Sequence, residues 1–201
     1  MNPAEAAAAS RPRVDGDREL EILQAALEIL TEVGFDKLTM DAVAARAKAS
    51  KATLYRRWSG KVQLVIEALH HTKTQEDHED VDTGSLRGDL QASYCGMGGL
   101  DDPQTVSVMS AVVTAVARDP EFAEAFRRDI IGPKLDSTKS IWQRARERGE
   151  IRDDVDLSLI EPALAGVVLH RVFVLGETPD QNLITRVIDE IILPCVQKED
   201  R

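Results

Sequence analysis

The sequence predicts an all-α protein in which a small N-terminal three-helix unit is followed by a larger helical domain. Three observations support this prediction. Apolar residues recur at helical spacing in almost every long segment, and no stretch shows the alternation of a β-strand. Two very short helical segments near the N-terminus are separated by a tight connection, KAS. The chain of 201 residues is also long enough for a small domain joined to a larger one.

The first helix is predicted over residues 17–33, because its apolar residues form one stripe at helical spacing. Gly34 follows the stripe and predicts a C-terminal cap, since glycine adopts the left-handed backbone that ends many helices. Residues 1–14 lack the basic start and long apolar core of a signal peptide and are expected to be a disordered tail. The residues of the stripe are Leu20, Leu23, Ala26, Leu27, Leu30 and Val33.

Two short helices are predicted next, each preceded by a hydroxyl residue that can cap it. Thr39 precedes MDAVAARA, and Ser50 precedes KATLYRRW. Leu54 and Trp58 lie four residues apart, which places both on the inner side of the second helix. A longer helix then begins near Gly60 and runs through VQLVIEALHHTK. This arrangement is typical of a helix-turn-helix motif.

Positive charge is concentrated in this motif. The whole chain has a formal net charge of -10, yet residues 41–61 contain six basic residues and one acidic residue. A basic patch on an otherwise acidic chain is the pattern expected of a compact DNA-binding face, because the acidic remainder is repelled by phosphate. The net acidity therefore does not exclude double-stranded DNA as a partner.

The rest of the chain reads as an acidic linker, TQEDHEDVDTGS, followed by about five helices. Pro120 is expected to restart a helix, Gly132 with Pro133 to kink the longest one, and Gly176 and Pro194 to end the last two. The predicted domains are the tail over 1–14, a helix-turn-helix domain over 15–70 with its motif at about 39–58, and a helical domain over 71–201.

Several classes of protein and site find no support in the sequence. No GxSxG, P-loop, HExxH or dinucleotide motif is present, so neither an enzyme nor a cofactor is predicted. Apolar runs stop short of the ~18 residues that span a bilayer, so a cytoplasmic protein without a membrane partner is expected. His70, His71 and His78 with nearby acids form a possible metal cluster. Because His71 and His78 are two helical turns apart, a solvated helix end is favoured over a metal site.

Residues 20–69 resemble the TetR family of transcriptional regulators. The resemblance rests on the first helix closed by Gly34 and Phe35, on VAARA and SKATLY, on the aromatic Trp58, and on Lys61 at the start of the next helix. The later helices resemble the family's ligand-binding and dimerisation domain in layout. The resemblance implies a homodimeric repressor that binds an inverted-repeat DNA operator and is released by a small-molecule effector. A helical interaction module, a metal sensor and an activator are the alternatives.

One position departs from the family pattern. The family usually has glycine in the turn between the two short helices, where this chain has Lys48. A lysine in the left-handed conformation costs about 1 kcal/mol, which glycine avoids. The turn is therefore expected to be either slightly strained or differently shaped, and it gains a positive charge near the phosphates.

The short helix after Ser50 is expected to enter the major groove, because base reading needs small polar and basic side chains in the first turns of such a helix. Lys51 and Thr53 are predicted to read base edges, whereas Tyr55 and Lys61 are predicted to hold phosphate. The predicted DNA-binding set is Thr39, Lys48, Ser50, Lys51, Ala52, Thr53, Tyr55, Arg56 and Lys61.

Two further sites are predicted in the larger domain. Its last two helices have more apolar surface than one bundle needs, which predicts a four-helix dimer interface. A ligand site is expected among the helices before them, although apolar residues at this spacing more often form a core. The predicted interface residues are Leu164, Val168, Leu169, Val172, Leu183, Ile184, Val187, Ile188 and Ile191. The predicted ligand residues are Leu90, Tyr94, Met97, Met109, Val113, Trp142 and His170.

Overall fold

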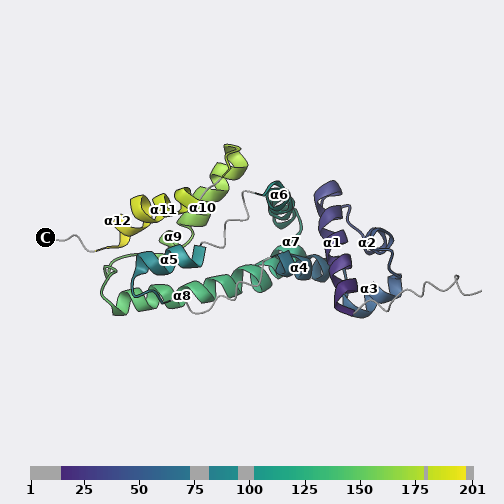
Figure 1. Cartoon of the computed structure of the whole chain (residues 1–201), viewed down its shortest axis with the longest axis horizontal. Helices are drawn as coiled ribbons and strands as arrows, with labels where there is room; N and C mark the ends of the chain where they lie inside the picture. The colour runs from purple at the N-terminus through teal and green to yellow at the C-terminus, as the bar shows by residue number, and fades with distance from the viewer. Residues whose placement is uncertain (1–14, 73–81, 95–101, 179–180, 198–201) are drawn as a thin grey trace, which may run out of the picture. The chain divides into compact units, whose positions relative to one another are not determined.

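The computed structural model describes residues 15–72, 82–94, 102–178 and 181–197. All regular structure within these ranges is helical, which confirms the all-α prediction. The chain divides into two compact units, Met1–Thr72 and Lys73–Arg201, whose helices are labelled in Figure 1. The expected tail, most of the expected linker, and Met97 lie outside the described residues.

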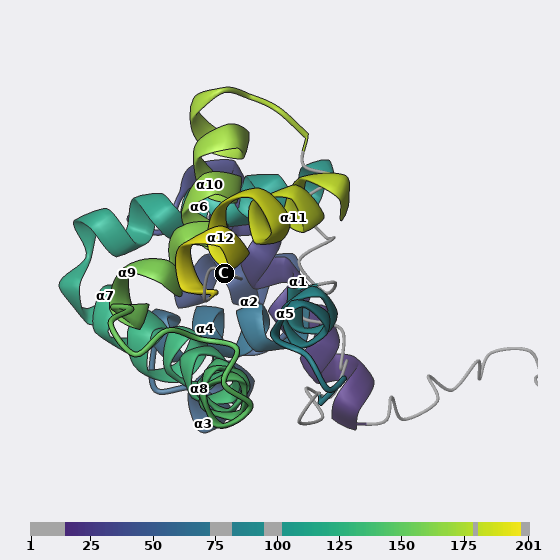
Figure 2. The same ribbon diagram turned by 90° about the vertical axis from the view of Figure 1, so that its left-hand side faces the viewer.

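The described part of the first unit contains four helices, and the two short ones, α2 and α3, form the helix-turn-helix pair. Helix α1 packs along α4 and also contacts α2, while α2 contacts α3 (Figure 2). The short pair α2 and α3 is therefore supported by the longest helix of the unit. The helices are α1 (Asp15–Val33), α2 (Met40–Arg46), α3 (Lys51–Arg57) and α4 (Lys61–Thr72).

The ends of these helices follow the local signals of the sequence. Gly34 has φ 79° after α1, as expected of a glycine cap. Thr39 Oγ1 accepts a hydrogen bond from the Ala42 amide at 3.2 Å, and Ser50 Oγ accepts one from the Thr53 amide at 3.1 Å. Each hydroxyl satisfies an amide that the first turn of the helix leaves without a partner. The three predicted caps are confirmed.

Leu54 and Trp58 anchor α3 in the core of the unit, as predicted. Leu54 is fully buried, and Trp58 is 1% exposed. The stripe predicted on α1 is wrong at both ends, because Leu20 is 51% exposed and Val33 is also exposed. Helical spacing gives the direction of an apolar stripe but not how far the neighbouring helices extend along it.

The second unit is built from the remaining helices. Helix α5 (Leu86–Tyr94) packs against α8 (Figure 1). The later helices are α6 (Pro103–Arg118), α7 (Pro120–Phe126), α8 (Gly132–Glu147), α9 (Leu157–Ile160), α10 (Ala163–Leu169), α11 (Gln181–Val187) and α12 (Leu193–Val196). Three π-helical turns continue them, namely η2 (Arg127–Ile131), η3 (His170–Val174) and η4 (Ile188–Ile192).

Two prolines lie inside continuous helical segments. Pro133 and Pro194 each follow the last residue of a π-helical turn, η2 or η4, by two positions. Proline has no N–H to donate, and its ring clashes with the carbonyl of the preceding turn. A π-helical turn changes the hydrogen-bond register there and so avoids both the missing donor and the clash. The kink expected at Gly132 and Pro133 is therefore a π-helical turn. The prediction that Pro194 ends the last helix is wrong, because α12 continues to Val196.

A buried carboxylate ties the start of α5 to the residues that follow α8. Asp89 is fully buried. It accepts hydrogen bonds from the amide and hydroxyl of Thr83 at 2.6 and 2.7 Å and from Arg148 Nη2 at 3.0 Å. Burial by itself raises the pKa of Asp89, but the Thr83 and Arg148 donors outweigh it and lower that pKa below its ordinary value. Glycine at position 88 is required, since a Cβ there would lie 2.2 Å from Thr83 Oγ1.

The segment Leu157–Val174 is apolar and weakly covered. By length and composition alone this segment of 18 residues is apolar enough to cross a membrane. The expectation that all apolar runs stop short of that length is therefore wrong. Only 17% of the segment is buried. Leu159 is 72% exposed and Val174 is 68% exposed. The described part of the chain thus leaves apolar surface on this segment uncovered.

Candidate nucleic-acid interface

The exposed side of α3 carries the side chains that were expected to face DNA. Lys51, Ala52 and Arg56 are exposed, and Tyr55 is 55% exposed. Thr53 is half-buried, because its hydroxyl lies 2.8 Å from the Ser50 hydroxyl at the start of the helix. A short capped helix with an apolar inner side and a small, polar and basic outer side has the geometry of a major-groove reading helix.

Lys51 forms an ion pair with an acidic neighbour on the protein surface. Its Nζ lies 2.6 Å from Asp41 Oδ2 on α2, and both side chains are largely exposed. The hydrogen bond with Asp41 is the main cause that raises the pKa of Lys51. Exposed pairs of this kind contribute about 0.2–1 kcal/mol. Lys51 can therefore exchange Asp41 for a base edge or a phosphate at little cost.

Two other basic residues of the motif, Arg46 and Arg57, form ion pairs with acidic residues of α1. Arg46 donates from Nη2 to Glu32 Oε2 at 2.6 Å, and Arg57 donates to Glu19. The hydrogen bond from Arg46 lowers the pKa of Glu32. Much of the positive charge counted in the sequence is thus already paired in the free protein.

The turn between α2 and α3 has the left-handed conformation usual for glycine. Lys48 has φ 51° and is the one non-glycine residue with a positive φ among the described residues. The Lys48 amide donates to the Ala45 carbonyl at 3.2 Å and the Ala49 amide to the Ala44 carbonyl at 2.8 Å, which is the Schellman pattern. Arg18 of α1 donates to the Lys48 carbonyl. Of the two shapes expected for the turn, the strained one is present.

Lys61 is the first residue of α4, and its side chain binds the loop that follows α1. Its Nζ donates to the Phe35 carbonyl at 2.9 Å and lies 4.2 Å from the centroid of the Phe35 ring. The ammonium group therefore fixes the start of α4 through a hydrogen bond and a cation–π contact. Its predicted contact with phosphate stays a prediction.

Two family models match the chain. The model described as "Bacterial regulatory proteins, tetR family" matches residues 22–68. The model described as "Tetracyclin repressor-like, C-terminal domain" matches residues 80–191. The chain belongs to the TetR family. It is a DNA-binding transcriptional regulator, and the helix-turn-helix interpretation of residues 39–58 lies within the matched region.

Individual proteins agree with this assignment. The DNA-binding transcriptional repressor TetR of Mycobacteroides abscessus is 34% identical, over 90% of this chain and 94% of that protein. The regulator AqdR of Rhodococcus erythropolis is 30% identical over 90% of this chain and 87% of that protein. The crystal structure of the TetR family regulator SCO0332 is 28% identical, covers 90% of this chain and 100% of that one, and has a TM-score of 0.64.

The ligand residues predicted for this TetR-family domain fall in different environments. Leu90, Tyr94 and Trp142 are buried in one apolar cluster built from α5, α8 and the last helices. Val113 and His170 are exposed, and Met109 is half-buried. The structure thus brings three of the described residues together, as part of the core of the unit.

The predicted dimer residues also differ in burial, and their place at an interface stays a prediction. Six of the nine are buried within the chain itself, so their apolar surface already serves the core. Leu169 and Leu183 are half-buried, and Ile191 is exposed. Helical periodicity marks apolar positions without showing which neighbour covers them. The six buried residues are Leu164, Val168, Val172, Ile184, Val187 and Ile188.

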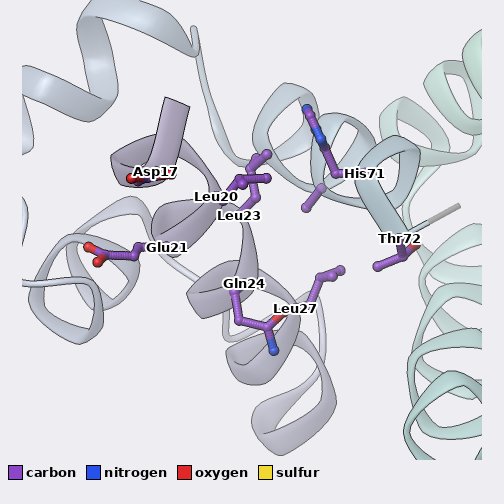
Figure 3. A pocket seen from close by; sticks show the side chains of 9 residues that line it. Asp17, Leu20, Glu21, Leu23, Gln24, Leu27, His71 and Thr72 are labelled. Atoms are coloured by element: carbon purple, nitrogen blue, oxygen red, sulfur yellow. The ribbon is translucent and has the colours of Figure 1, made fainter. Parts of the chain in front are cut away.

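A pocket that the sequence did not indicate lies on the first unit, between α1 and α4 (Figure 3). It has a volume of about 580 Å³. The exposed Leu20 forms part of its wall, and His71 of α4 lines it. The lining residues are Asp17, Leu20, Glu21, Leu23, Gln24, Leu27, Ala68, His71 and Thr72.

Proposed function

We propose that this TetR-family regulator is a repressor that binds an inverted-repeat operator as a homodimer and leaves it when a small molecule binds the second unit. The observation that carries the proposal is the outer side of α3, where small, polar and basic side chains surround a capped first turn. The relative named as a repressor, from Mycobacteroides abscessus, supports the direction of regulation. A DNA target places its action in the cytoplasm.

In this proposal Lys51, Thr53 and Arg56 read base edges, and Ala52 allows close approach. Lys51 first leaves Asp41, and the loss of that exposed pair is repaid by the contact with DNA. Phosphate is held by the remaining members of the set, Thr39, Lys48, Ser50, Tyr55 and Lys61.

The proposed dimer buries the apolar surface that Leu157–Val174 leaves exposed, together with Leu175 and Ile191. Two copies related by a two-fold axis present two α3 helices to half-sites roughly 34–36 Å apart, which is one turn of DNA. An effector that changes this separation lowers the affinity for both half-sites together.

A gel-shift titration tests the proposal on the full chain, with DNA from its own upstream region and with random duplex of equal length. We expect a shift of the specific fragment that survives heparin and weakens steeply with salt, because phosphate contacts release counterions. Equal affinity for both duplexes at every salt concentration would contradict a sequence-specific regulator.

A further inference from the structure

Three metal-ligating side chains meet between α1 and α4. Glu19 comes from α1, whereas Glu67 and His71 come from α4. One ligand atom of each lies within 4.8 Å of the others. Glu67 and His71 are spaced i, i+4, so both project from one face of α4. That α1 packs along this helix explains why Glu19 completes the group.

The two carboxylates of the group lie close together and are partly shielded from solvent. The side chains of Glu19 and Glu67 are 16% and 30% exposed. Two carboxylates this close need a proton or a cation between them. In this structure Arg57 supplies the cation, since it pairs with Glu19 and lies 3.5 Å from Glu67 Oε1.

We propose that Glu19, Glu67 and His71 bind one divalent zinc-like ion per chain, and that Arg57 balances their charge when the ion is absent. Two carboxylate oxygens and one imidazole nitrogen are ligands that suit zinc, and a water molecule completes a four-coordinate site. The imidazole favours zinc over magnesium or calcium, which prefer oxygen alone. Ligand atoms in such a site lie about 3.4 Å apart, so binding requires the ligand side chains, chiefly the exposed His71, to move closer by roughly 1 Å.

Trp58 orients one of the proposed ligands, Glu67. Its Nε1 donates to Glu67 Oε2 at 2.7 Å, and the indole is itself buried in the core. The bond holds the carboxylate in place and leaves Oε1, the atom nearer Arg57, to face the ion. Hydrogen bonds of this kind orient metal ligands in known sites.

Arg57 connects the site to α3, of which it is the last residue. An ion that replaces its guanidinium on the two carboxylates releases a positive charge at the end of the DNA-reading helix. The metal site itself does not depend on the proposed DNA target, and its test therefore uses no DNA.

Zinc titration of the full chain against a chromophoric chelator, after removal of metals with EDTA, measures the site directly. We expect one zinc ion per chain with a micromolar dissociation constant. His71→Ala and Glu19→Gln should each weaken binding by about ten-fold or more. His70→Ala is the matched control, because His70 is the exposed neighbour on the same helix and lies outside the group. Circular dichroism verifies that each variant is folded.

A second control separates this site from the acidic segment near His78, which lies outside the described residues. His78→Ala should leave zinc binding unchanged. If His78→Ala removes binding, or if His71→Ala binds as tightly as the parent protein, the proposal is wrong. The absence of zinc binding in the parent protein would overturn it equally.

Two further measurements test the geometry and the role of Arg57. Cobalt should give a visible absorption band in the parent protein and in His70→Ala, and no such band in His71→Ala. Arg57→Ala removes the competing cation and should tighten zinc binding about two- to five-fold, the range expected for an exposed pair. Weaker binding in Arg57→Ala would contradict the exchange of guanidinium for metal.

Discussion

Individual side chains of the proposed DNA-binding set differ in how freely they can reach a base or a phosphate. Lys51 is paired with Asp41, and the Thr53 hydroxyl is hydrogen-bonded to the Ser50 hydroxyl. Lys48 and Arg56 are exposed and have no acidic partner among the described residues. The number of basic residues in the motif therefore overstates the charge that is free before DNA arrives.

Base-reading and phosphate-holding residues should respond differently to alanine. Lys51→Ala and Thr53→Ala should each cost about 1–3 kcal/mol on the operator and less on random DNA, which relaxes sequence preference. Lys61→Ala should weaken all sequences alike and lower the salt slope by about one unit. Fluorescence anisotropy with both duplexes at several salt concentrations measures this. Identical losses on both duplexes for every variant would rule out base reading by Lys51 and Thr53.

Removal of the acid that holds Lys51 should strengthen DNA binding. Asp41→Asn frees the ammonium group and should raise operator affinity about two- to five-fold, as expected for an exposed pair. The same substitution in a Lys51→Ala background is the control, because a double-mutant cycle isolates the pair. Equal gains in both backgrounds would show that Asp41 acts through its general repulsion of DNA and not through Lys51.

Lys48 offers a test of backbone strain. Lys48→Gly should raise the free energy of unfolding by about 0.5–1 kcal/mol, because glycine adopts φ 51° without steric cost. Lys48→Ala should give no such gain, since it removes the charge and keeps the strain. Urea denaturation compares the three proteins, and specific operator binding should persist in Lys48→Gly. Equal stability of the glycine and alanine variants would contradict the assignment of strain.

The helix ends of the two units depend on contacts between residues at different separations in the sequence. In the first unit the caps at Thr39 and Ser50 act within one turn. In the second unit the start of α5 depends on Asp89, whose partner Arg148 lies 59 residues away in sequence. The π-helical turns before Pro133 and Pro194 keep two long helical segments continuous where proline would otherwise break them.

Asp89 should make the second unit sensitive to acid. Its pKa is lowered in the folded state, so its contribution to stability is present above the ordinary pKa of about 4 and is lost as pH falls through the lowered value. Asp89→Asn should reduce the free energy of unfolding by about 1.5–3 kcal/mol at neutral pH, because Thr83 and Arg148 lose hydrogen bonds to a charged carboxylate. Urea denaturation of both proteins between pH 7 and about pH 3 measures the difference. A difference that stays constant over this range would contradict the role of the charge.

At the scale of the whole molecule, the second unit leaves apolar surface on Leu157–Val174 uncovered by its own described residues, and a second copy is proposed to cover it. Leu159 and Val174 are the most exposed large apolar residues there. The buried members of the predicted interface set, such as Leu164, Val168 and Ile188, face the chain's own core, and their role in a dimer stays a prediction.

A charge on this surface should separate the dimer. Val174→Glu should shift the molecular mass in light scattering from dimer to monomer at micromolar concentration, because a carboxylate cannot be buried against apolar residues without a partner. Val113→Glu is a matched control, as Val113 is exposed on α6, outside this segment. A parent protein that is monomeric at that concentration, or a Val174→Glu variant that remains a dimer, would contradict the proposed interface.

The sequence by itself determined the features that depend on near neighbours. The caps at Thr39 and Ser50 and the inner side of α3 at Leu54 and Trp58 follow from spacings of three and four residues, which a single turn of helix enforces. These features were sufficient to predict the helical class and the helix-turn-helix motif.

Only the tertiary structure decided which partners distant residues have. Three contacts join segments far apart in sequence: Arg57 with Glu19, Asp89 with Arg148, and Ile188 with the core that includes α5 and α8. Periodicity shows that a side chain faces inward, but the helix that lies opposite is set by the packing of the whole unit. The candidate metal group at His71 became visible for the same reason, because its third ligand comes from a helix about fifty residues earlier.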